Sequence, residues 1–114
     1  FINWDEPIVL CEGVFDAISI RRNAIPILGK SISNELYKKI LTSKLTDIYI
    51  ALDEDAKDVA LKIAEKLIAG GFRVYLIELP GKDPSEMGFQ NFTELVQNAI
   101  ELDFSKIMLQ KLNL

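Results

Sequence analysis

Histidine is absent from this 114-residue sequence, and cysteine and tryptophan each occur once. Without histidine, the chain cannot build a histidine-dependent catalytic triad, a histidine general base or the zinc sites that most often use imidazole ligands. A single cysteine, Cys11, excludes an internal disulfide, and its place in an apolar run favours a small buried side chain. Any chemistry that this chain performs therefore depends on carboxylates, lysines or hydroxyl groups.

Long apolar segments and an excess of basic residues are also lacking. No apolar run approaches the roughly 18 residues that a membrane-spanning helix needs, and the N-terminus does not resemble a signal peptide, so we expect an intracellular protein without membrane contact. The 13 basic and 17 acidic residues give a formal net charge of −4, which disfavours unaided binding to nucleic-acid phosphates. Binding to nucleic acid would therefore require a metal ion or a basic partner.

The length and the 49% hydrophobic content predict one compact domain, residues 1–114, with a real core. The first residue is Phe1 instead of methionine, so we expect this domain to be a piece of a longer protein. Trp4 precedes the first apolar run and is interpreted as a packing residue or a junction to a further domain.

Short apolar runs alternate with helical patterns along the chain. Strands are predicted at residues 8–11, 25–28, 46–52 and 72–79, and helices at residues 14–22, 33–42, 55–69 and 92–101, with apolar residues 104–112 forming a short closing helix. Ser33 can cap the second helix, and Gly70 with Gly71 can end the third. This alternation predicts an α/β fold, with a mostly parallel sheet of about four strands and helices on both faces.

Charged residues follow the predicted strands where each strand ends. Glu12 follows the first strand, Lys30 the second, Asp53 and Asp55 the third, and Asp83 the fourth. Because ligands of such sheets bind beyond the carboxyl ends of the strands, we expect these side chains to share one edge.

The acids Asp53 and Asp55 follow the third strand at a spacing of two residues. In extended chain, such residues point to the same side, so both carboxylates can face one point while Glu54 turns away. Paired carboxylates suit Mg²⁺, which often takes only one or two protein carboxylates together with substrate phosphates. The alternative is that these acids begin the next helix and complement its dipole, with Asp55 as a cap.

A glutamate and a glycine end the first strand. Glu12 facing two aspartates would crowd negative charge, so it can ligate a metal or move a proton, whereas Gly13 leaves room for a close approach. The alternative is that Glu12 is an ordinary acid at a helix N-terminus. Lys30 and Lys82 can contact phosphate as point charges, or they are solvated loop lysines.

Three stretches, "VLCEGVFDAISI", "IALDEDAKDVALKIAEKL" and "LPGKDPSEMG", together resemble the motifs of the Toprim domain of DnaG-type primases, especially their phage relatives. The resemblance runs from about Pro7 to Phe92 and implies a Toprim-like, Rossmann-like fold. It also implies roles for single residues: catalysis and metal binding by Glu12, Asp53 and Asp55, metal binding by Asp83, and secondary roles for Asp16 and Glu86. From their positions alone, we expect Gly13, Lys30 and Lys82 to contact phosphate or nucleotide.

The activity that this resemblance implies is that of a DNA primase, a nucleotidyltransferase in DNA replication. Such an enzyme uses Mg²⁺ or Mn²⁺ to join ribonucleoside triphosphates into RNA primers on a single-stranded DNA template, in the bacterial cytoplasm or a phage-infected host. A replicative helicase is the implied partner, and we expect the isolated domain to be inactive alone.

Other functions stay open at this point. The same acids would serve a Toprim nuclease or topoisomerase-type domain, and a docking module that has lost catalysis is a further possibility. A phosphoacceptor signalling domain has a similar length. Such domains usually carry two adjacent acids after the first strand and a hydroxyl residue after the fourth. Here one acid and a glycine, Glu12 and Gly13, follow the first strand, and Pro80 and Gly81 follow the fourth, so this function is disfavoured.

Overall fold

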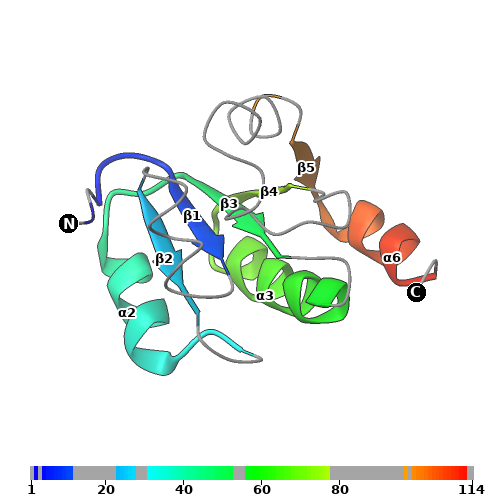
Figure 1. Ribbon diagram of the computed structural model, residues 1–114, viewed down its shortest axis with the longest axis horizontal. Helices are drawn as coiled ribbons and strands as arrows, with labels where there is room; N and C mark the ends of the chain where they lie inside the picture. The colour runs from blue at the N-terminus through cyan, green and yellow to red at the C-terminus, as the bar shows by residue number, and fades with distance from the viewer. Residues whose placement is uncertain are drawn as a thin grey trace.

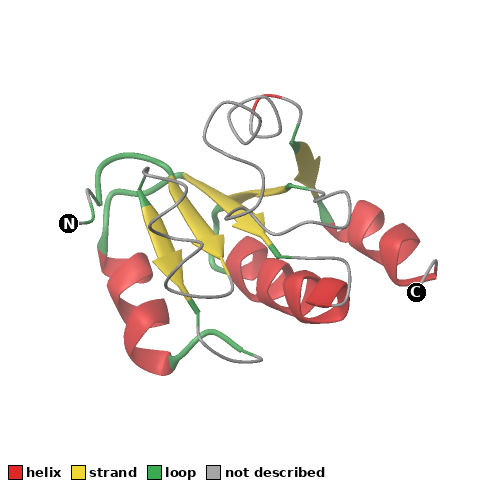
Figure 2. Cartoon of the chain, viewed as in Figure 1, coloured by secondary structure: helices red, strands yellow, loops and turns green. Residues whose placement is uncertain are grey.

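A computed structural model describes residues 2, 4–11, 23–27, 31–52, 56–77, 97 and 99–112. Figure 1 shows the elements in chain order and Figure 2 shows them by type. They are β1 (Ile8–Cys11), β2 (Ala24–Pro26), α2 (Asn34–Thr42), β3 (Asp47–Ala51), α3 (Lys57–Ala69), β4 (Arg73–Leu76), β5 (Ile100–Leu102) and α6 (Phe104–Leu112). The predicted first helix, residues 14–22, lies outside the described residues.

The strands form one five-stranded sheet in the order β2-β1-β3-β4-β5. Strands β1 to β4 pair in parallel, which confirms the predicted α/β class and the mostly parallel sheet. Strand β2 lies at an edge of the sheet, where Pro26 is tolerated because edge strands leave donor positions unpaired. The first and second motifs therefore leave the sheet from neighbouring strands.

The fifth strand was not predicted. The sequence favoured a helix over residues 92–101, but Ile100 and Glu101 belong to β5, which pairs antiparallel with β4 through Leu76↔Ile100 and Val74↔Leu102. Pairing with the open side of β4 overrides the local helical preference, as often happens when tertiary contacts compete with a weak pattern. The predicted helix is therefore wrong at its C-terminal end.

Local signals set the bounds of the two central helices. Ser33 is the N-cap of α2, and its Oγ accepts a hydrogen bond from the backbone N–H of Leu36 at 3.1 Å. Helix α3 ends at Gly70, and Gly71 follows with φ of 97°, a conformation that favours glycine. Both ends are as predicted, whereas the N-cap of α3 is Ala56 and not Asp55.

The main core lies between the sheet and the three helices α2, α3 and α6. Fully buried residues from each layer meet there, such as Ile50 of β3, Ile40 of α2, Leu61 of α3 and Ile107 of α6. Trp4 packs against the same core, as predicted. These described helices all cover one face of the sheet.

The second face carries a smaller apolar cluster. Val9, Cys11, Ala24, Ala51 and Ile77 are its buried members. Cys11 is fully buried, in agreement with the prediction that it is a small core side chain. Across the described part of the chain, no helix is long and apolar enough to cross a membrane.

Candidate functional site

The carboxyl ends of the parallel strands lie level with one another. Cys11, the last residue of β1, is the register partner of both Ala51 at the end of β3 and Pro26 at the end of β2. In Figure 1 the arrows of β1, β2 and β3 point the same way. The segments that follow these strands in sequence therefore start from one edge, which we call the carboxyl edge.

Backbone hydrogen bonds extend this alignment beyond the strands themselves. The N–H of Ile27 donates to the carbonyl of Cys11 at 2.9 Å, and the N–H of Ile77 donates to the carbonyl of Ile50 at 2.9 Å. Such bonds fix the chain up to the last described residue of each segment, because a buried backbone donor without a partner is costly. The carboxyl edge is therefore a rigid boundary formed by four strands.

The acidic segment of the second motif is anchored on both sides. Leu52, which precedes it, is only 5% exposed and belongs to the main core. Ala56, which follows it, packs against the same core and leads directly into α3 at Lys57. Residues 53–55 therefore join two fixed points at the carboxyl edge.

The predicted site residues themselves fall between the described segments. Glu12, Gly13, Asp16, Lys30, Asp53, Asp55, Lys82, Asp83 and Glu86 all lie outside the described residues. Their side-chain geometry stays a prediction, as do their roles. Among the residues that are described, no group of three or more Cys, Asp or Glu side chains could hold a metal ion.

One salt bridge of the structure lies far from the carboxyl edge. Arg73 Nε donates to Asp47 Oδ1 at 2.8 Å, and these residues begin β4 and β3 at the opposite end of the sheet. The hydrogen bond with Asp47 raises the pKa of Arg73 above its ordinary value. Since the pair joins residues 26 positions apart, only the strand register reveals it.

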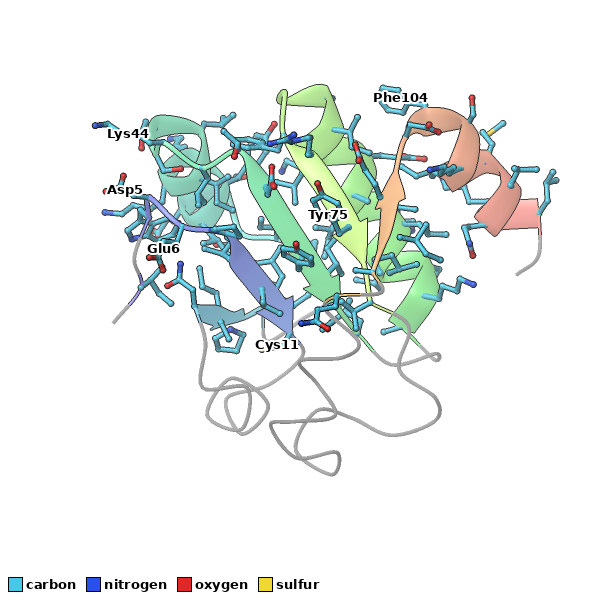
Figure 3. All side chains as sticks on the ribbon, turned by 90° about the horizontal axis from the view of Figure 1, so that it is seen from above. Asp5, Glu6, Cys11, Lys44, Tyr75 and Phe104 are labelled. Atoms are coloured by element: carbon cyan, nitrogen blue, oxygen red, sulfur yellow. The ribbon has the colours of Figure 1, made fainter. Side chains whose placement is uncertain are left out.

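A stacked pair of tyrosines lies on the second face next to this ion pair. The rings of Tyr49 and Tyr75 are register partners with centroids 4.8 Å apart and planes inclined by 19°. In Figure 3, Tyr75 is near the middle of the sheet and Cys11 is at the carboxyl edge. Burial raises the pKa of Tyr75, and the nearby Asp47 and Glu101 carboxylates raise it further.

The sequence does not predict this stack, because each tyrosine occurs alone within its own strand pattern. Its position halfway along β3 and β4 separates it from the predicted site. We therefore assign the stack to the stability of the sheet, since cross-strand aromatic pairs stabilise neighbouring strands.

Comparison with solved structures identifies related folds. The primase of Aquifex aeolicus, in a crystal structure of its zinc-binding and RNA polymerase domains, superposes with a TM-score of 0.72 at 24% identity over 84% of this chain and 26% of that one. The Escherichia coli primase catalytic core gives a TM-score of 0.70 at 21% identity, over 93% of this chain and 37% of that one. The fold is therefore that of the corresponding part of these primases.

Comparison with curated sequences finds bacterial relatives. Uncharacterized proteins of Mycoplasma genitalium and Mycoplasma pneumoniae are each 33% identical over 81 residues, which is 66% of this chain. The match spans 37% and 38% of these relatives, so the chain corresponds to little more than a third of their length. The likeness to phage primases stays a prediction.

A family comparison covers the first two motifs and all but the last residue of the third. The family described as Toprim-like matches residues 9–87, which is more than half of the 114 residues. This stretch begins within β1 and includes β2, α2, β3, α3 and β4. The chain therefore belongs to the Toprim-like family.

Proposed function

We propose that this chain is the metal-binding catalytic domain of a DNA primase, which makes RNA primers on single-stranded DNA from ribonucleoside triphosphates. The observation that carries the proposal is the register of Cys11 with Ala51 in a Toprim-like chain. Glu12 is the next residue after Cys11, and Asp53 is two residues after Ala51. The sheet thus supports the convergence of the first and second motifs, and the fold of two bacterial primases supports the reaction class.

The donor set suits a hard divalent cation. Glu12, Asp53 and Asp55 supply only carboxylate oxygens, the ligands that Mg²⁺ and Mn²⁺ prefer, and Asp83 adds one more. A divalent ion held by these residues would neutralise triphosphate charge and activate the attacking hydroxyl. Because this chain has no histidine, these carboxylates are the expected side-chain ligands of the site.

The other predicted residues have roles at the same edge. Gly13 leaves space for a phosphate beside the Glu12 backbone. Lys30 and Lys82 neutralise phosphate oxygens as point charges, and Asp16 and Glu86 are secondary acids that hold water or lysine in the surrounding layer. The buried, hydrogen-bonded strand ends that precede these segments support a common edge for these groups.

Metal binding tests the core of this proposal. Titration of the 114-residue chain with Mn²⁺, followed by electron paramagnetic resonance, should show binding at millimolar or tighter affinity. Asp53→Asn and Asp55→Asn should each weaken it at least tenfold, whereas Glu54→Gln, with the same charge change in the same segment, should not. Equal loss in all three variants would show that only general negative charge matters and would contradict the site.

The same variants separate a metal site from structural caps. Removing one charge from a crowded group of carboxylates relieves repulsion, so without metal both asparagine variants should be as stable as the parent or more stable. A large loss of stability in thermal melts of both variants would assign the acids to the fold instead.

Primer synthesis requires more of the protein than this chain. The net charge of −4 disfavours a template strand, and the chain spans only 26% and 37% of the two primases, so we expect a longer version to be necessary. The assay compares the 114 residues with a longer version on single-stranded DNA with ribonucleotides and Mn²⁺. Template-dependent synthesis by the short chain would overturn this expectation, and DNA cleavage in place of synthesis would favour a Toprim nuclease.

A further inference from the structure

Helices α2 and α3 carry four exposed lysines. We call this set the basic strip: Lys38 and Lys39 on α2, and Lys62 and Lys66 on α3. The salt bridges within the described part of the chain join Arg73 with Asp47 and Lys111 with Glu65, and include none of these four.

A contact through Tyr37 joins the two helices. The hydroxyl of Tyr37 on α2 donates to the carbonyl of Lys66 on α3 at 3.3 Å. A Cβ placed on Gly70 would lie 3.0 Å from the same hydroxyl and 3.4 Å from Leu41 Cδ2. Lys66 is therefore held beside α2, next to the turn that carries Lys38 and Lys39.

Aromatic rings position two of the ammonium groups. Lys66 Nζ lies 4.5 Å from the ring centroid of Tyr37, and Lys39 Nζ lies 5.7 Å from that of Trp4. A cation–π contact attracts the ammonium without a carboxylate acceptor, so N–H donors stay available to an anion. Lysines held in this way lose less side-chain entropy when a ligand binds.

The charge of these helices contrasts with that of the whole chain. Together α2 and α3 carry five lysines and three acids, a net charge of +2, whereas the chain has a formal net charge of −4. The acids are Glu35 and Asp58 in the first turns and Glu65, which pairs with Lys111 on α6. Positive charge is therefore concentrated toward the last turns of both helices.

We propose that the basic strip binds the phosphate backbone of a single-stranded nucleic acid. Trp4 and Tyr37 are only partly buried, and each lies beside one of the lysines. This pairing favours nucleic acid over an acidic peptide, because aromatic side chains beside cations also offer contacts to bases. The choice of nucleic acid rests on the proposed function. The location of the strip is independent of the proposed function, because it follows from the path of α3, which leads away from the carboxyl edge toward the amino end of β4.

The strip consequently lies away from the predicted metal site. In Figure 3, Lys44, which follows α2, is at the end of the sheet opposite Cys11. A strand bound along the strip would be retained by the helical face while the acids at the carboxyl edge stay accessible to nucleotide and metal. Binding at the strip therefore needs no metal ion.

The test measures binding of a fluorescein-labelled 15-residue oligothymidylate in EDTA, where a metal site cannot contribute. The fluorescence of Trp4, the chain's one tryptophan, should change on binding. The double variant Lys38→Gln, Lys39→Gln should bind at least tenfold more weakly at low salt. Since each lost phosphate contact on single-stranded DNA removes about 0.7 from the slope of log affinity against log salt, the slope should become shallower by about 1.4.

A charge-matched control removes two lysines elsewhere. The variant Lys57→Gln, Lys106→Gln carries the same net charge but changes only lysines outside the strip and leaves the Lys111–Glu65 pair intact, so its affinity and salt slope should equal those of the parent. Circular dichroism should show the same helicity in both variants, since glutamine is a good helix former. Equal weakening in both variants would overturn the strip, because only net charge would then matter.

Two further outcomes would also overturn the proposal. One is an absence of oligothymidylate binding by the parent chain at low salt, and the other is binding of a polyglutamate peptide with equal affinity and the same dependence on the strip. The Mn²⁺ titration involves neither nucleic acid nor the strip. Failure of the oligothymidylate assay would therefore leave the proposed metal site standing, and failure of the Mn²⁺ titration would leave the location of the strip standing.

Discussion

Replacing Gly71 with alanine should destabilise the domain through the backbone alone. Gly71 has φ of 97°, and a Cβ added there would meet no atom within 4 Å. The cost therefore contains no steric clash with neighbouring groups and equals the penalty of a side chain in the left-handed region, about 1–2 kcal/mol. For a domain of this size, that corresponds to a decrease in Tm of roughly 5–10 °C.

Gly70→Ala is the matched comparison, because it adds the same Cβ atom one residue earlier, where the backbone conformation suits alanine but a neighbouring atom is close. Gly70 has φ of −79°, which alanine adopts freely, but its Cβ would lie 3.0 Å from the Tyr37 hydroxyl. That hydroxyl is the far end of a flexible side chain, so it can move away from the new Cβ. Alanine also restricts the unfolded chain, which offsets the cost of the contact, so we expect the free energy of unfolding to change by no more than about 0.5 kcal/mol.

Urea denaturation followed by circular dichroism measures both variants. Gly71→Asn should recover part of the loss, because asparagine tolerates positive φ better than alanine does. The reasoning would be refuted if Gly71→Ala were as stable as the parent, or if Gly70→Ala cost more than Gly71→Ala.

Three other predictions concern the cap, the tyrosine stack and the C-terminal helix. Ser33→Ala should cost about 1 kcal/mol in urea denaturation, since the N-cap bond is lost, and aspartate at this position should restore it. Because burial and the nearby Asp47 raise the pKa of Tyr75, the folded state holds its proton more tightly than the unfolded state. Its stabilising contribution is therefore complete below about pH 10 and is lost as the pH rises further; Tyr75→Phe should remove this dependence from unfolding curves measured at alkaline pH. Ile107→Ala should cost about 2–5 kcal/mol because Ile107 is 1% exposed, whereas Met108→Ala, at a residue 62% exposed, should change stability by less than about 0.5 kcal/mol.

Local patterns were sufficient to predict much of the fold. The apolar run at β1, the β-branched and aromatic run at β3 and the three-to-four spacing along α3 each produced the expected element. Ser33 and Gly71 act within one turn of chain, so their roles are readable from neighbouring residues alone. Such signals depend on short-range backbone chemistry, which is fully contained in the sequence.

Features that depend on distant partners could not be predicted in this way. Strand β5 exists because β4 offers it a partner, and the local sequence of residues 92–101 favours a helix. Asp47 and Arg73 meet because their strands begin in register, although neither residue shows a sign of pairing. The alternative that Asp55 caps α3 is also wrong, since α3 begins two residues later than expected, at Lys57, with Ala56 as its N-cap.

The candidate site combines both kinds of information. The sequence shows that acids follow the first and third strands, but the pairing of Cys11 with Ala51 could only come from the sheet. The side-chain positions of Glu12, Asp53 and Asp55 stay predictions, and the Mn²⁺ titration is their direct test.

The direct pairing of β1 with β3 also has a consequence for the gene. The chain between these strands includes β2, on the other side of β1, and α2, so the lengths of the connections within it do not determine how the ends of β1 and β3 align. Lengthening such a connection costs little, because the entropy of loop closure grows only with the logarithm of its length. Insertions and deletions should therefore be tolerated between the two motifs, whereas one residue added between Cys11 and Glu12, or between Ala51 and Asp53, should not be. A search for remote homologues should fix these two short offsets and leave the interval between the motifs free.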